Sequence, residues 1–147
     1  MESQVTGATT EGRRITAVTA DTAGRERRYA ASAFVLATGG FESGALAVDS
    51  YGVVRERVLD LPLVGVPPQG SPPCDADYWA EHPLFRAGVA VDAAMRPIGP
   101  DGEAVYENLY AVGGLLAEAI RWREKSGEGI ALASALAAAD SILEDDS

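Results

Sequence analysis

The chain has 147 residues, of which 47% are apolar, and its 22 acidic and 12 basic residues give a net charge of −10. This length and apolar content suffice for one domain with its own core. The acidic balance argues against a nucleic-acid partner, because such binding needs a basic face. No apolar run reaches the roughly 18 to 20 residues that cross a bilayer, so direct membrane insertion is not expected.

The single cysteine, Cys74, has no second cysteine for a disulfide and no histidine or cysteine partner for a metal site. We therefore expect neither a disulfide nor a bound metal. A lone thiol fits a reducing compartment, so the sequence indicates a cytoplasmic protein.

The first thirty residues predict a small antiparallel meander. Residues 14–19 alternate polar and apolar side chains, as a half-buried strand does, and glycine-containing turns flank them. We expect three strands over residues 5–8, 14–19 and 27–30.

The next strand ends in a pair of glycines. Residues 33–37 are continuously apolar, which predicts a strand buried on both faces. Thr38, Gly39 and Gly40 follow it. Open α/β sheets bind ligands at the carboxyl ends of their strands, so this turn could face a nucleotide, with the Thr38 hydroxyl available to a phosphate or ribose. A plain strand and tight turn would have the same sequence.

The middle of the chain is the least regular part. Short helical segments are expected over 44–49 and 75–81, on either side of a proline-rich loop. His82 is the only histidine and the side chain best suited to carry a proton near neutral pH. Arg86 could bind an anionic substrate. The ordinary alternatives are a hydrogen-bonded loop histidine and a surface ion pair.

The last third repeats the pattern of a strand ending in glycines. We expect strands over 87–92 and 106–112, and Gly113 and Gly114 follow the second. A helix over 129–143 comes next, and its nearly continuous apolar surface predicts burial on most sides. The free N–H groups and positive dipole end at its start suit an anion.

Basic residues just before this helix form a cluster that could meet phosphate, although a solvated loop is an equal alternative. The cluster consists of Arg121, Arg123 and Lys125.

Four segments together resemble a known family. They are Ala-Thr-Gly-Gly-Phe at 37–41, His-Pro at 82–83 with Gly-Val-Ala-Val-Asp at 88–92, Glu-Asn-Leu-Tyr-Ala-Val-Gly-Gly at 107–114, and Gly-Glu-Gly-Ile-Ala at 127–131. The combination resembles the C-terminal half of the B subunit of anaerobic glycerol-3-phosphate dehydrogenase. That family belongs to the wider fumarate reductase and succinate dehydrogenase flavoprotein group.

The resemblance implies an α/β fold, namely a partial Rossmann-like flavin-dinucleotide-binding domain with an antiparallel meander. Such flavoproteins begin with a G-x-G-x-x-G strand–turn–helix unit, which this chain lacks. Residues 1–147 are therefore expected to form a single domain that is the C-terminal fragment of a longer flavoprotein, without its first βαβ unit.

The resemblance also implies a function. The parent protein would use FAD or FMN to oxidise a small-molecule substrate, with His82 and Arg86 as candidates for substrate contact. The chain alone is expected to bind flavin weakly or not at all and to be inactive. The residues expected to approach the cofactor are Thr38, Gly39, Gly40, Gly113, Gly114, Gly127, Gly129 and Ile130.

Expected partners are the missing N-terminal half or a partner subunit, through which the protein could lie at a membrane surface. A homodimer is also possible, because an uncovered sheet edge or apolar face invites self-association. The alternative function is a non-catalytic binding or subunit-interaction module on a degenerate flavoprotein scaffold.

Overall fold

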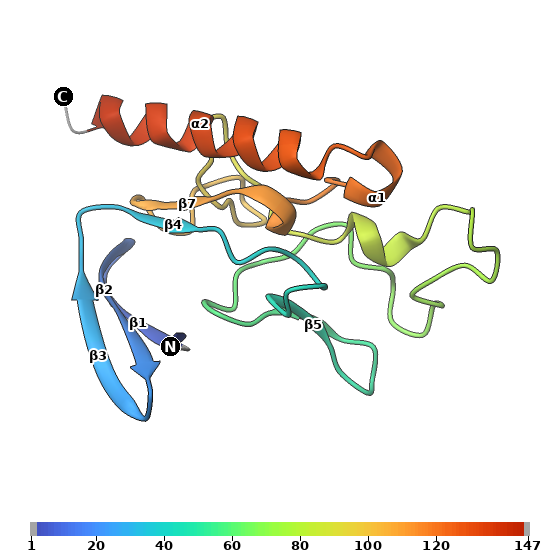
Figure 1. Ribbon diagram of the computed structural model, residues 1–147, viewed down its shortest axis with the longest axis horizontal. Coiled ribbons are helices and arrows are strands. Elements are labelled where there is room, and N and C mark those ends of the chain that lie inside the picture. Colours follow the sequence, from blue (N-terminus) through green and yellow to red (C-terminus); the bar gives the residue numbers. More distant parts are fainter. Residues whose placement is uncertain (1–2, 146–147) are drawn as a thin grey trace.

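A computed structural model describes residues 3–145, and two short parallel strands lie at its centre (Figure 1). Strand β4 (Phe34–Leu36) pairs in parallel with β7 (Leu109–Ala111), with Val35 opposite Tyr110. Helix α2 (Gly127–Asp145) runs along one face of this pair. The mixed α/β character expected from the sequence is therefore confirmed.

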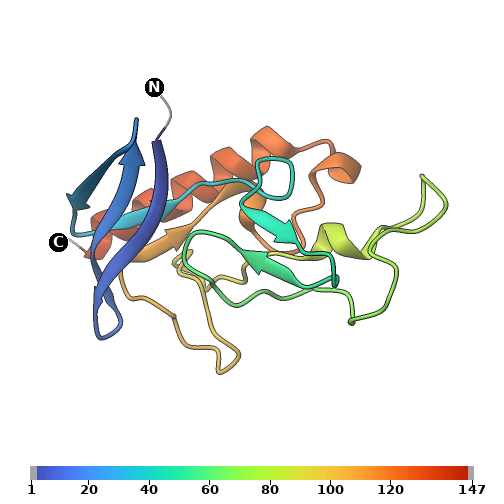
Figure 2. The same cartoon turned by 90° about the horizontal axis from the view of Figure 1, so that it is seen from below.

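The predicted antiparallel meander is present and lies near the amino ends of the central strands (Figure 2). It consists of β1 (Ser3–Glu11), β2 (Arg14–Thr22) and β3 (Arg25–Ala30), in the order β1-β2-β3. The strands are longer than expected because the connecting turns are very short. Ala23 and Gly24 both have positive φ, which matches the twist of a tight hairpin.

The helix expected at 44–49 is wrong, because this stretch contains a strand. Strand β5 (Leu46–Val48) pairs antiparallel with β6 (Val54–Glu56). The Asp49 carboxylate organises the connecting turn by accepting hydrogen bonds from Tyr51 N and Val53 N, each at 2.9 Å. An aspartate that binds the backbone just after it favours a turn over a helix.

The helical turn expected at 75–81 is also wrong. Asp75 and Asp77 accept hydrogen bonds from backbone N–H groups two residues further on, which competes with helix formation. The short 3₁₀ helix η1 (Pro83–Arg86) follows instead. Residues 87–92 form isolated bridges, such as Val89 with Leu116, rather than the continuous strand that was expected.

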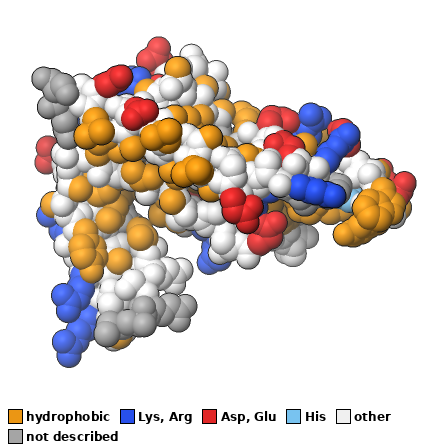
Figure 3. All heavy atoms as spheres, turned by 45° about the horizontal axis from the view of Figure 1, so that its top comes forward, with side chains coloured by type: hydrophobic (Ala, Val, Ile, Leu, Met, Phe, Trp, Pro, Cys, Tyr) orange, Lys and Arg blue, Asp and Glu red, His pale blue; other side chains and the backbone are white. Residues whose placement is uncertain are grey.

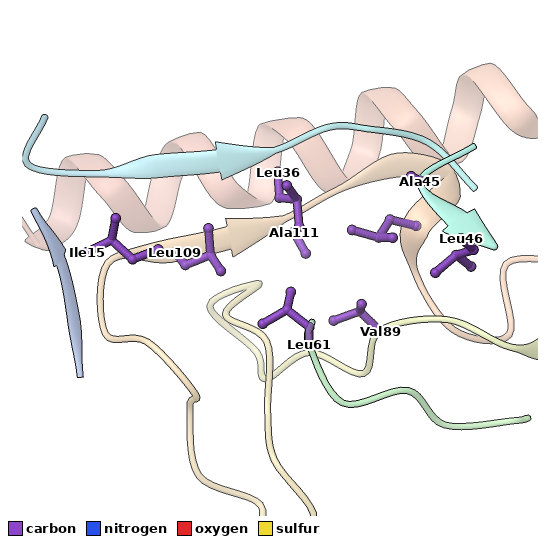
Figure 4. Packing of buried hydrophobic residues seen from close by; sticks show 9 residues of the cluster. Ile15, Leu36, Ala45, Leu46, Leu61, Val89, Leu109 and Ala111 are labelled. Carbon is purple, nitrogen blue, oxygen red and sulfur yellow. The ribbon is translucent and has the colours of Figure 1, made fainter. Parts of the chain in front are cut away.

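The main hydrophobic core lies on the face of the β4–β7 pair away from α2 (Figure 4). Alternation along β7 directs Leu109 and Ala111 into this core and Tyr110 and Val112 toward Ala138 of α2. Strand β7 is thus buried on both faces, as its apolar sequence predicts. The main core consists of Ile15, Leu36, Ala45, Leu46, Leu61, Val89, Leu109, Ala111 and Leu115.

Two burial expectations are wrong. Val35 of β4 is 51% exposed, because α2 lies against Tyr110 and Val112 of β7 rather than over β4. Within the described part of α2, only Ser134 and Ala138 are buried. One face of the helix packs on β7, and no second layer of the described residues covers its other face.

Candidate functional site

The two glycine turns meet at the carboxyl ends of β4 and β7. Gly40 lies so close to Gly114 that a Cβ atom on Gly40 would be 2.7 Å from the Gly114 carbonyl oxygen. Gly39 has a φ of 76°, and a Cβ there would fall 2.3 Å from the Ser43 hydroxyl oxygen. Only glycine allows both the positive φ at position 39 and the close approach of the backbone at position 40 to the Gly114 carbonyl.

Arg121 occupies the space in front of these glycines. It opens the short helix α1 (Arg121–Glu124), shortly after the 3₁₀ helix η2 (Gly113–Leu115). A Cβ on Gly114 would lie 2.6 Å from Arg121 Cζ, and Arg121 Nη2 pairs with Glu42. The cavity beside this ion pair is only about 20 Å³, which is close to the room for one water molecule.

The start of α2 completes the cluster. A Cβ on Gly127 would lie 3.8 Å from Arg121 Cβ, so Gly127 sits beside the same side chain. Gly113 N donates to Ser134 Oγ at 2.9 Å, which ties the turn after β7 to the second turn of α2. The sequence analysis did not single out Ser134. A polar residue among the alanines of this helix could have indicated a hydrogen bond from the helix to a neighbouring turn.

Gly129 and Ile130 lie in the first turns of α2. Ile130 N donates to the Ser126 carbonyl at 2.8 Å, and a Cβ on Gly129 would make only an ordinary contact with Ser126. The Ser126 hydroxyl donates to Glu124, so this side chain does not act as the cap that its position suggests.

The Thr38 hydroxyl is an unpartnered polar group next to the glycine turn in the sequence. Its oxygen is buried, and no hydrogen-bond partner for it exists among the described residues. Buried polar atoms are nearly always paired, so an orphan indicates a missing partner. Thr38 directly precedes the glycine turn, and it lines a separate pocket together with Val5, Ser43 and Arg57.

Comparison with known proteins matches this site to a family. The profile of the FAD binding domain matches residues 13–130. The chain belongs to this FAD binding domain family. The matched stretch contains both glycine turns, Arg121 and the start of α2.

Curated relatives confirm the resemblance to the B subunit of anaerobic glycerol-3-phosphate dehydrogenase. The protein of that name from Yersinia pseudotuberculosis is 31% identical over 115 residues, covering 78% of this chain and 26% of the relative. The corresponding proteins from Actinobacillus pleuropneumoniae and Haemophilus influenzae are 33% and 32% identical, covering 82% and 80% of this chain and 28% of each relative. The chain thus spans about a quarter of the length of these relatives. No solved structure matches it significantly.

The family is described as an FAD binding domain, and two features of the glycine turns suit the approach of a ligand. The Thr38 hydroxyl lacks a partner among the described residues, and the absence of side chains on Gly40 and Gly114 exposes backbone at a second place. A cavity of about 20 Å³ is far smaller than the several hundred Å³ typical of cofactor sites. Residues 3–145 therefore enclose no cofactor-sized pocket at the glycine cluster.

His82 and Arg86 lie outside the glycine cluster, and both side chains are engaged. His82 Nδ1 accepts from Asp75 N at 3.0 Å, and Nε2 lies 3.1 Å from the Tyr78 carbonyl oxygen. Arg86 Nε donates to Glu118 at 2.8 Å. The neighbouring Phe85 lines the small cavity beside Arg121, so the segment touches the edge of the cluster. Substrate contact by either residue remains a prediction.

A larger polar pocket lies at the opposite end of the central strands. Its volume is about 420 Å³, and its lining includes Arg14, Arg96 and Asn108. Tyr110 donates to Asp145 at 2.8 Å in the same pocket, and burial together with this hydrogen bond raises the pKa of Tyr110 to about 12. Sequence reasoning did not single out this group, because its members come from distant segments.

Within residues 3–145, no group of three or more His, Cys, Asp or Glu side chains could hold a metal ion. Among the helices described, none has the length and apolar character needed to cross a bilayer.

Proposed function

We propose that the chain supplies one wall of the flavin site in an oxidoreductase resembling the B subunit of anaerobic glycerol-3-phosphate dehydrogenase. The observation that carries the proposal is the contact between Gly40 and Gly114. The unpartnered Thr38 hydroxyl, two residues before Gly40, supports it. This contact lies at the carboxyl ends of parallel strands, where open α/β sheets bind ligands.

In this proposal the protein binds and orients the cofactor. A bound flavin supplies two-electron redox chemistry, which is a property of the cofactor itself. The Thr38 hydroxyl would donate to an oxygen of FAD, and the turns at Gly39–Gly40 and Gly113–Gly114 would let the backbone approach it closely. The amino end of α2 would direct the N–H groups of Gly127 and Gly129 and the helix dipole toward the cofactor. Ile130 would lie beside it, because its own N–H is bonded to the Ser126 carbonyl. The substrate would be a small hydroxylated molecule.

The rest of the flavin site would come from additional polypeptide. The chain corresponds to about a quarter of its relatives' length, and it contains no G-x-G-x-x-G turn for the pyrophosphate. Residues 1–147 would then be one domain of a partial Rossmann-like kind, lacking its first βαβ unit. We expect the chain alone to bind FAD weakly and to have no dehydrogenase activity.

The relatives are named as one subunit of a dehydrogenase, which supports a partner polypeptide for this chain as well. Association with a membrane surface would occur through that partner, because no described helix could cross a bilayer.

A second candidate is a non-catalytic module on the same scaffold. The ion pair between Arg121 and Glu42 favours it, because the Arg121 side chain fills the space in front of Gly114. If that closed arrangement is permanent, no flavin can reach the glycine cluster.

Flavin retention distinguishes the two candidates. Residues 3–145 would replace the matching stretch of a curated relative, and the flavin content of the purified hybrid would be read by absorbance. We expect the hybrid to retain FAD and its Gly114→Leu variant to lose it, because a side chain there meets Arg121. A folded hybrid without flavin would favour the non-catalytic module. Tight stoichiometric FAD binding by the chain alone would disprove the need for additional polypeptide.

A further inference from the structure

The polar pocket at the amino ends of the central strands is separate from the glycine turns. Its volume is about 420 Å³, and its wall includes Arg14 at the start of β2, Ser32 just before β4 and Glu107 just before β7. Asp145 at the end of α2 completes it. Basic and acidic side chains both occur at the left-hand end of the molecule, where α2 ends (Figure 3). A pocket of this volume has room for a small molecule.

Hydrogen bonds hold the strand starts around this pocket in place. The buried Asn108 accepts from Ile15 N at 2.9 Å through Oδ1 and donates to the Ser32 carbonyl at 2.8 Å through Nδ2. The neighbouring Glu107 N donates to the Arg13 carbonyl at 2.8 Å. The backbone that presents the polar side chains is therefore fixed before a ligand binds, which lowers the entropy cost of binding.

Two of the four charged side chains in the pocket are compensated by neighbours. Arg96 Nε donates to Asp92 Oδ2 at 2.8 Å. Asp145 accepts the Tyr110 hydroxyl at 2.8 Å and also attracts Arg96. These charges balance one another and leave little net charge for a ligand to meet.

The other two charged side chains, Arg14 and Glu107, carry opposite charges. Neither forms an ion pair with any residue of the described range 3–145, although both line the same pocket. Arg14 Nη2 makes a hydrogen bond of 3.3 Å to the Ser32 carbonyl, and a guanidinium has further N–H donors. A cation and an anion that face one pocket without pairing suit a ligand that carries both charges.

The remaining lining defines the size and orientation of such a ligand. Ala33 and Ile142 give the pocket a small apolar area, where both pack against the cluster around Tyr110. The pocket also lies at the carboxyl end of α2, whose dipole favours a positive group. The lining therefore fits a ligand with a short apolar side chain.

We propose that this pocket binds a small zwitterion of the α-amino acid class. The ligand carboxylate would pair with the Arg14 guanidinium, and its ammonium group would pair with the Glu107 carboxylate near the end of α2. An anion alone would leave Glu107 uncompensated, and a cation alone would leave Arg14 uncompensated. The proposal does not depend on flavin binding.

Titration of the ¹⁵N-labelled chain with L-valine, followed by backbone NMR, tests the proposal. We expect saturable shifts of the Arg14, Ser32 and Glu107 amide signals, while those of Gly40 and Gly114 stay in place. Two matched probes separate the charges, because isovalerate lacks the ammonium group and isobutylamine lacks the carboxylate. Each should bind at least about tenfold more weakly than L-valine.

Three variants assign the two charges. Arg14→Gln should weaken L-valine binding by about tenfold or more. Glu107→Gln should lower the affinity for L-valine to about that for isovalerate. The control is Arg27→Gln, which removes an equal charge from an exposed position of β3 outside the pocket and should leave binding unchanged. Unchanged signals elsewhere in the spectrum verify that each variant is folded.

Three results would overturn the proposal. One is the absence of saturable shifts at high millimolar L-valine. Another is equal binding of L-valine and isovalerate, because Glu107 would then have no role. The third is L-valine binding that survives Arg14→Gln, because another surface would then hold the ligand.

Discussion

At the scale of single residues, the account depends on Gly40 having no side chain. A Cβ there would lie 2.7 Å from the Gly114 carbonyl oxygen and 3.1 Å from Arg121 Nη2, so the backbone would have to shift. We predict that Gly40→Ala lowers the free energy of unfolding by about 1 to 3 kcal/mol, as overpacking does. Gly7→Ala is the control, because a Cβ on Gly7 meets nothing within 4 Å. Urea denaturation that gives both variants the same stability would contradict the contact.

The Tyr110 hydroxyl provides a test at high pH. Burial and the hydrogen bond to Asp145 raise its pKa to about 12, from about 10 in an unfolded chain. The folded state therefore holds this proton more tightly than the unfolded state does. The stability that results is complete below about pH 10 and is lost as the pH rises through about 12, up to about 2 to 3 kcal/mol.

Tyr110→Phe removes this titration. We predict that the free energy of unfolding, measured with urea at about pH 8 and about pH 11, falls less in Tyr110→Phe than in the wild type. The exposed tyrosines Tyr29, Tyr51 and Tyr78 remain in both proteins and provide the internal control. Equal losses in the two proteins would show that the Tyr110 proton does not stabilise the fold.

At the scale of elements, Asn108 joins the meander to the central strands. Its Oδ1 accepts from Ile15 N at 2.9 Å, and its Nδ2 donates to the Ile15 and Ser32 carbonyls, each at 2.8 Å. The side chain is buried, so its loss leaves backbone groups without partners. We predict that Asn108→Ala costs about 2 to 4 kcal/mol in thermal or urea unfolding.

The control for this prediction is Thr6→Ala. The Thr6 hydroxyl also bonds the backbone of the meander, at 3.3 Å to the Thr19 carbonyl, but it is exposed. Its loss should change stability by less than about 0.5 kcal/mol. If both variants lose the same small amount, Asn108 does not anchor the meander.

Element prediction from the sequence succeeded where a local pattern decides the structure. The alternation in residues 14–19 and the glycines of the turns predicted the meander, and the apolar run before Gly113 predicted β7. It failed where aspartate side chains bind the neighbouring backbone, at Asp49 after β5 and at Asp75 and Asp77. These hydrogen bonds from aspartate side chains to the backbone depend on local geometry, and the spacing of apolar residues along the sequence gives no information about them.

At the scale of the whole molecule, the sequence predicted neither the exposure of α2 nor the position of Arg121. An alanine-rich helix is usually enclosed, but here the described sheet has only two strands in parallel and covers one side of it. Arg121 appeared from the sequence only as part of a basic cluster. Its place against Gly114 depends on how η2 and α1 direct the chain back toward β4.

Backbone NMR of the ¹⁵N-labelled chain during titration with FAD tests the central claim most directly. Chemical shifts report even weak binding, residue by residue, so the experiment does not require an enclosed pocket. The account predicts that the amide signals of Thr38, Gly39, Gly40, Gly113, Gly114 and Gly127 move together, while those of the meander stay in place. Shifts confined to the polar pocket around Arg14 and Tyr110, or no shifts at all, would contradict a flavin-facing glycine cluster.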